Sequence, residues 1–277
     1  MGGFVTCDNG SDAYGLMIKA NRHIITGGEL SAAQRKIIAG RLFAARASSR
    51  QVLRFYEGVR YPGNKDKNGG GGMYPAFFVP PYNGGKKFQT VIPMSPKTHI
   101  LSANSYELEI IRLLHLFAPE DAEVARMKDE TLRRLRGTCF GFNGCFAGEC
   151  FESAVVALRF LAAAAPDDAC WHMRQIDLFN AHFGDKKRNG GVLIYFALCL
   201  SELPYETAEP EIRRNLNAIA AKLSRAYSFA DENSKTDLTV KLCVLRNALS
   251  RLDEFARIRD RQPYQSEGDG KLRFDMA

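Results

Sequence analysis

Apolar residues recur with a helical period over most of the chain. Between residues 31 and 57 they return every three or four positions, and the helix face that they form includes Ile37 and Leu53. Ser31 and Gln34 have the spacing of a capping box, in which the two side chains satisfy free backbone groups at a helix start. The pattern therefore predicts one helix over 31–57 that begins at Ser31.

Further helical patterns follow, separated by proline and glycine residues. Proline and glycine commonly end helices, the first because it lacks a backbone N–H. The predicted helices cover 104–117, 119–136, 148–165, 167–183, 190–203, 209–228 and 235–260. Two of them, at 148–165 and 190–203, are apolar on nearly every side, so we expect each to be surrounded by other helices. Helix starts near 148, 190 and 235 are spaced as in helical repeats, although their residues do not repeat.

One stretch departs from the helical period. Residues 61–96 hold six of the 11 prolines, and two β-prone runs flank the sequence Asn83, Gly84, Gly85. Asn-Gly between two such runs is a strong hairpin signal. The sequence predicts a β-hairpin over 74–93.

These patterns predict a mainly α fold, either a multi-helix bundle or an irregular helical-repeat-like array, with one β-hairpin insertion. With 277 residues, of which 45% are hydrophobic, the chain can bury a sizeable core. We expect one continuous globular domain. It comprises a basic N-terminal region at 1–100, a helical core at 101–262 and a flexible tail at 263–277.

Charge is unevenly distributed. Residues 1–100 hold 14 Lys and Arg against 5 Asp and Glu, whereas residues 137–185 hold 2 against 6. A concentration of basic residues indicates a polyanionic partner, although a solvated helix face gives the same composition. The predicted anion-binding residues are Arg35, Arg46, Arg50, Arg54, Lys65, Lys67, Lys86, Lys87, Lys186, Lys187 and Arg188. Aromatic residues Tyr61, Tyr74, Tyr82 and Phe88 are interleaved with them, as in proteins that bind single-stranded nucleic acid.

The segment CFGFNGCFAGEC, residues 139–150, brings three cysteines together ahead of an apolar helix. Their intervals differ from the closely spaced cysteine pairs of structural zinc sites, so no metal site is predicted. Cys145 and Cys150 lie near a helix start, where a thiol becomes more acidic, and they are candidate nucleophiles with His172 as a candidate base. The alternative is a compact turn in which the thiols fill space.

Several classes of protein lack support in the sequence. No apolar run is long enough to cross a bilayer, and no secretory signal precedes the first helix, so we expect a cytoplasmic protein with reduced thiols and no membrane contact. Met1 to Thr6 does fit the short pattern for N-myristoylation. No phosphate-binding or dinucleotide-binding glycine motif is present, and no cofactor is predicted.

The sequence leaves three functional hypotheses. The leading one is a binding protein that contacts a polyanion, with nucleic acid as the favoured class, through its basic N-terminal region. The second is an enzyme with a Cys/His pocket between helices. The third is a helical scaffold for a protein partner or a homodimer. A leucine seam at 238–256 has heptad spacing and suits either pairing of two copies or packing within one chain.

Overall fold

The computed structural model describes residues 13–58, 75–80, 88–144, 148–183 and 190–277. Over these residues the protein is mainly helical with one two-stranded antiparallel hairpin, which confirms the predicted fold class. The α-helices are α1 (Ala13–Ile25), α2 (Ala32–Ala44), α3 (Ser49–Gly58), α4 (His99–Phe117), α5 (Ala122–Arg136), α6 (Cys150–Ala164), α7 (Ala169–Phe183), α8 (Gly190–Glu202), α9 (Tyr205–Arg214), α10 (Leu216–Leu223) and α11 (Glu232–Leu249). A π-helix, η1 (Cys139–Asn143), and a 3-10 helix, η3 (Asp253–Ile258), complete the helices.

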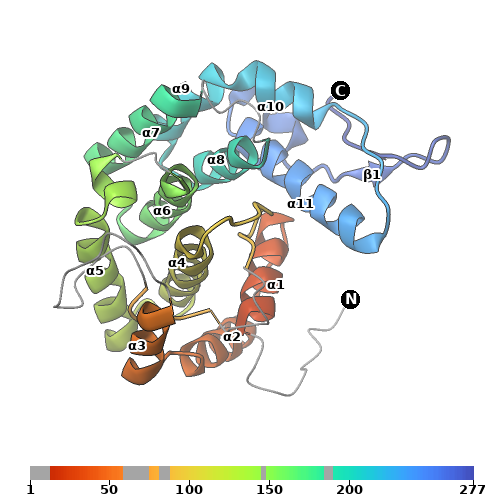
Figure 1. Cartoon of the computed structure of the whole chain (residues 1–277). Coiled ribbons are helices and arrows are strands. Elements are labelled where there is room, and N and C mark those ends of the chain that lie inside the picture. The colour runs from red at the N-terminus through yellow and green to blue at the C-terminus, as the bar shows by residue number, and fades with distance from the viewer. Residues whose placement is uncertain (1–12, 59–74, 81–87, 145–147, 184–189) are drawn as a thin grey trace.

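The helices form an array of inner and outer members (Figure 1). Inner helix α4 packs against α6, α6 against α8, and α8 against α11, while α5, α7 and α9 follow on the outer side. The first helix, α1, contacts both α4 and α11 and so closes the row of inner helices. The array explains the spacing of helix starts in the sequence, because an outer helix follows each of the inner helices α4, α6 and α8.

Helices α6 and α8 lie at the centre, as their apolar sequences predict. Nearly all residues of α6 are buried, and so is the stretch of α8 from Tyr195 to Leu200. Aromatic side chains join them to α7, since the ring of Phe179 stacks on Phe196 at 3.7 Å between centroids and on Phe151 at 5.5 Å. No helix in the described part of the chain is long and apolar enough to span a membrane.

The helix predicted over 31–57 is in fact two helices. The capping box of Ser31 and Gln34 is present at the start of α2, as expected. The helix ends at Ala44, and the Ala47 N–H donates to the carbonyl of Phe77 at 2.8 Å instead of continuing the helix. Ser48 then caps α3 with Gln51, whose side chain accepts from the Ser48 N–H at 2.7 Å. A second capping signal inside the apolar pattern therefore divides it.

This break changes which residues are buried. Ile37 and Leu53 were expected on one packed face, but they are 56% and 62% exposed. Arg35, on α2, and Arg54, on α3, belong to helices with separate axes. The single basic ridge that a continuous helix would carry is therefore replaced by two shorter faces.

The hairpin lies elsewhere than predicted. Within 74–93, the described segments 75–80 and 88–93 contain no strand, and residues 81–87, with the predicted turn, lie outside the described residues. The Glu107 side chain accepts hydrogen bonds from the backbone N–H groups of Ala76 at 2.9 Å and Phe77 at 2.6 Å. Because a buried carboxylate takes these donors, they are not available for a strand ladder.

The strands belong to the C-terminal segment that was predicted as a flexible tail. Strand β1 (Tyr264–Gln265) pairs with β2 (Leu272–Arg273), and Leu272 also forms a bridge with Tyr227. The side chains of Leu272 and Phe274 are buried in the core. The pairing and burial anchor residues 264–274 to the helical array.

Two further elements differ from the sequence analysis. Helix α1 was not predicted. It contacts α2, α4 and α11, and its buried residues include Met17, Ala20 and Asn21. The leucine seam was predicted with two possible roles, and the structure settles between them. Its members from Leu242 to Leu252 are buried within the same chain, where α11 packs on α8 and α10.

Candidate functional site

The strongest concentration of exposed charge in the described N-terminal region lies on α2, α3 and the link between them. Six basic side chains are exposed here, and Glu57 is the acidic residue of the same stretch. They are Arg35, Lys36, Arg41, Arg46, Arg50 and Arg54, and we call them the α2–α3 surface. Helices α2 and α3 lie at the same end of the molecule (Figure 1).

Ion pairing divides these six residues. Arg46 pairs with Glu123 of α5, which also binds Arg126, so its charge is partly neutralised. The Arg35 Nε donates to the Leu30 carbonyl at 3.0 Å. The other four, Lys36, Arg41, Arg50 and Arg54, form no ion pair with any described residue. Their charges are therefore available to a partner.

The remaining predicted anion-binding residues, Lys65, Lys67, Lys86, Lys87, Lys186, Lys187 and Arg188, lie outside the described residues. The same holds for three of the four interleaved aromatic residues, Tyr61, Tyr74 and Tyr82. The fourth, Phe88, is half-buried, and its ring lies 4.6 Å from that of Tyr14. Phe88 is therefore used in packing.

A groove runs beside the α2–α3 surface, between α2 and the corner where α4 meets α5. Its volume is about 1080 Å³, and most of its lining is apolar, including Phe43, Leu116 and Phe117. Arg35 and Lys36 form one rim, and Glu120 and Asp121 form the other. Leu116 is 43% exposed at its edge. Sequence reasoning missed the groove because its two walls are about 80 residues apart in the chain.

The cysteine segment folds as a π-helix followed by the start of α6. Gly141 is required within η1, because an added Cβ would lie 2.3 Å from the Leu135 carbonyl oxygen. The Gly141 carbonyl accepts hydrogen bonds from the side chains of Trp171, at 2.7 Å, and Gln175. This arrangement brings the Cys139 Sγ within 3.5 Å of the Cys150 Sγ.

The proposed cysteine–histidine chemistry gains no geometric support within the described residues. Cys145 lies outside them. His172 is fully buried. Neither of its ring nitrogens forms a hydrogen bond with any described residue, so His172 is not hydrogen-bonded to Cys150. Burial lowers the pKa of His172, and the backbone carbonyls of Leu161 and Ala165 oppose that shift. The imidazole is therefore a neutral group of the core.

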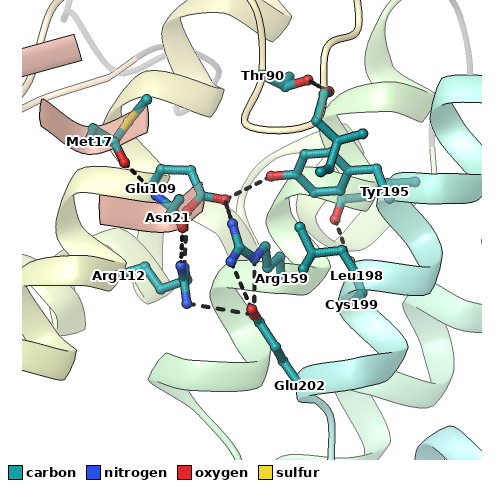
Figure 2. Close-up of polar contacts among 12 residues, drawn as sticks. Met17, Asn21, Thr90, Glu109, Arg112, Arg159, Tyr195, Leu198, Cys199 and Glu202 are labelled. Atoms are coloured by element: carbon teal, nitrogen blue, oxygen red, sulfur yellow. Dashed lines mark hydrogen bonds and ion pairs between the residues drawn. The ribbon is translucent and has the colours of Figure 1, made fainter. Parts of the chain in front are cut away.

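The interior contains a charge cluster that sequence reasoning missed. Figure 2 shows side chains from α1, α4, α6 and α8 pointing toward one another. The Arg159 guanidinium pairs with Glu109 at 2.8 Å and with Glu202 at 2.7 Å. Arg112 pairs with Glu109 at 3.0 Å and Glu202 at 3.6 Å. Two guanidinium groups thus balance two carboxylates, and we call these four residues the interior cluster.

The pKa values of Glu109 and of the neighbouring Tyr195 are both moved away from neutral pH. Burial raises the pKa of Glu109, but the charges of Arg159 and Arg112, with a hydrogen bond from Tyr195, outweigh it and hold that pKa at about 2. Burial and the Glu109 charge raise the pKa of Tyr195 well above its usual value. Neither Glu109 nor Tyr195 exchanges a proton near neutral pH, so neither is poised for acid–base catalysis. The interior cluster joins α4, α6 and α8.

The wider comparisons give no assignment. No protein-family model, no curated protein and no solved structure matches the chain. Among the described residues, no group of three or more His, Cys, Asp or Glu side chains is arranged to hold a metal ion.

Proposed function

We propose that this protein is a non-catalytic binding protein that contacts a polyanion, with nucleic acid as the favoured class, through the α2–α3 surface. The observation that carries the proposal is the exposure of Lys36, Arg41, Arg50 and Arg54, none of which pairs with a described carboxylate. Such cations displace counterions from a phosphate backbone, and the resulting affinity falls steeply with salt.

The form of α3 suits contact with the phosphate backbone of a nucleic acid. Arg50 and Arg54 are four residues apart, so they lie on one helix face. Leu53, exposed beside them, adds an apolar contact. Guanidinium groups on phosphates position a partner but carry no sequence information. Binding is therefore expected to be tolerant of sequence.

The test is fluorescence anisotropy with labelled single-stranded DNA, duplex DNA and RNA over a range of salt concentrations. The variant carries Arg41→Gln, Arg50→Gln and Arg54→Gln together. We expect weaker binding to every sequence and a slope of log affinity against log salt that is lower by about 3, one for each phosphate contact removed.

The matched control removes three exposed arginines elsewhere, with Arg133→Gln, Arg225→Gln and Arg257→Gln. The two triple variants change the net charge by the same amount. A loss of affinity that arises from net charge alone would therefore be the same in both. The proposal is wrong if the protein fails to bind any of the three nucleic acids at low salt, or if the two variants weaken binding equally.

A second candidate function, pairing of two copies, is favoured by the groove. Its rims carry opposite charges, with Arg35 and Lys36 facing Glu120 and Asp121. A two-fold axis through such a surface places the basic rim of each copy against the acidic rim of the other. The exposed Leu116 would become buried in the contact.

Gly40 allows this pairing to be tested without disturbing the fold. It lines the groove, and an added Cβ would meet no atom within 4 Å. Gly40→Trp should therefore fill the groove, while Gly40→Ala serves as the control. Light scattering over a range of concentrations should detect a dimer for the native protein and the alanine variant, and a monomer for the tryptophan variant. A monomeric native protein at every concentration excludes this candidate.

A further inference from the structure

Two thiols that are 11 positions apart in the sequence meet at the start of α6. Cys139 is the first residue of η1 and is partly exposed, whereas Cys150 is the first residue of α6 and is 5% exposed. Their sulfur atoms lie 3.5 Å apart. This contact is independent of the α2–α3 surface.

We infer that Cys139 and Cys150 are a redox-modification site that forms an intramolecular disulfide by exchange with a low-molecular-weight disulfide such as oxidised glutathione. A disulfide bond is about 2.05 Å long, so the sulfur atoms need to approach by about 1.5 Å. Both residues stand at the first position of a helix, where the backbone N–H groups have no partner within the helix that a small shift would break.

The exchange proceeds in two steps. The more exposed Cys139 loses its proton to solvent, and its thiolate attacks one sulfur of oxidised glutathione, so that a mixed disulfide forms and one glutathione thiolate leaves. Cys150 then loses its proton and attacks the Cys139 sulfur, which releases the second glutathione. Two protein thiols are oxidised to one disulfide while one glutathione disulfide is reduced to two thiols.

The bond would fasten three elements together. Glu149, next to Cys150, accepts hydrogen bonds from the Thr98 hydroxyl and from the Leu101 N–H, at the beginning of α4. A covalent link from Cys139 to Cys150 would therefore restrain η1, α6 and the first turn of α4. Oxidation is expected to raise the unfolding temperature and to slow hydrogen exchange at 97–101, because a cross-link restricts the unfolded chain.

The experiment equilibrates the full chain in mixtures of reduced and oxidised glutathione, quenches with acid and alkylates the remaining thiols. Trypsin releases residues 137–159 as one peptide, because no lysine or arginine lies between Arg136 and Arg159. A protease specific for glutamate then cuts between Glu149 and Cys150. The expected product is a pair of peptides joined by a disulfide, two hydrogen atoms lighter than the thiols, with the alkyl group on Cys145.

Four serine variants identify the partners. Cys145→Ser and Cys170→Ser should keep the cross-link and the rise in unfolding temperature, since neither thiol takes part. Cys139→Ser and Cys150→Ser should lose both, while circular dichroism confirms that each variant is folded. The inference is overturned if no cross-link forms even in oxidised glutathione alone, or if Cys150 bonds to Cys145 when Cys139 is present.

Discussion

The arginines of the interior cluster and those of the α2–α3 surface have the same chemistry but opposite surroundings. Arg159 is fully buried and is paired with two carboxylates. Arg54 is exposed and forms no ion pair with a described residue. A buried charge that loses its partner is strongly destabilising, whereas water stabilises an exposed one. The two regions should therefore respond differently to the same substitution, the first in stability and the second in binding.

Removal of Arg159 is expected to give the largest effect. Arg159→Met keeps an unbranched side chain but leaves the carboxylates of Glu109 and Glu202 with one cation for two anions. The free energy of unfolding should fall by about 3–5 kcal/mol. Urea denaturation followed by circular dichroism measures it, with Arg54→Met as the matched surface variant. A loss below about 1 kcal/mol would contradict the assigned role of the cluster.

Acid should weaken the interior cluster in a defined range of pH. The pKa of Glu109 is about 2 in the folded protein, below its usual value of 4.5. The stability that its ionisation provides, about 3 kcal/mol, is therefore fully present above pH 4.5 and is lost as the pH falls toward 2. Denaturation curves should be measured between neutral pH and about pH 3. The difference in free energy of unfolding between the native protein and the Glu109→Gln variant should become smaller as the pH falls.

A surface carboxylate provides the comparison. The hydrogen bond from Arg126 lowers the pKa of Glu123 to about 2, but the Glu123 side chain is 32% exposed, whereas that of Glu109 is buried. Glu123→Gln should change the acid dependence of stability much less, and added salt should remove the difference because it screens exposed charges. A change as large as that of Glu109→Gln would show that burial is not what separates the two sites.

The smallest effect on stability is expected at the α2–α3 surface. Each of Arg41→Gln, Arg50→Gln and Arg54→Gln should alter the free energy of unfolding by no more than about 0.5 kcal/mol. The same chemical denaturation experiment measures this on each single variant and on the triple variant that is used for nucleic-acid binding. A large loss would mean that these side chains stabilise the fold, and the change in binding would then need another explanation.

The features of the fold that depend on local sequence patterns could be predicted from the sequence. Helical periodicity gave the fold class and the central positions of α6 and α8, and the spacing of Ser31 and Gln34 located the start of α2. These features depend on residues within a few turns of one another. The location of the hairpin could not be predicted in the same way, because Glu107 takes backbone donors about 30 residues earlier in the chain.

The same distinction between local patterns and distant contacts applies to the site residues. Exposure of Arg50 and Arg54 follows from the pattern of α3, but the pairing of Arg46 with Glu123 joins residues 77 positions apart. The interior cluster leaves one local signal, namely charged residues inside apolar helices, such as Arg159 in α6. That signal marks a buried charge but does not identify its partner. The contact between Cys139 and Cys150 likewise depends on how η1 folds.

The contact between α1 and α11 has a consequence for biosynthesis. The Asn247 amide donates to the Ile25 carbonyl across 222 positions, and Arg22 pairs with Asp237. A ribosome releases α1 long before α11 has been made, so α1 must wait for α11 before this contact can form. During that interval the apolar side of α1 is a natural target for chaperones.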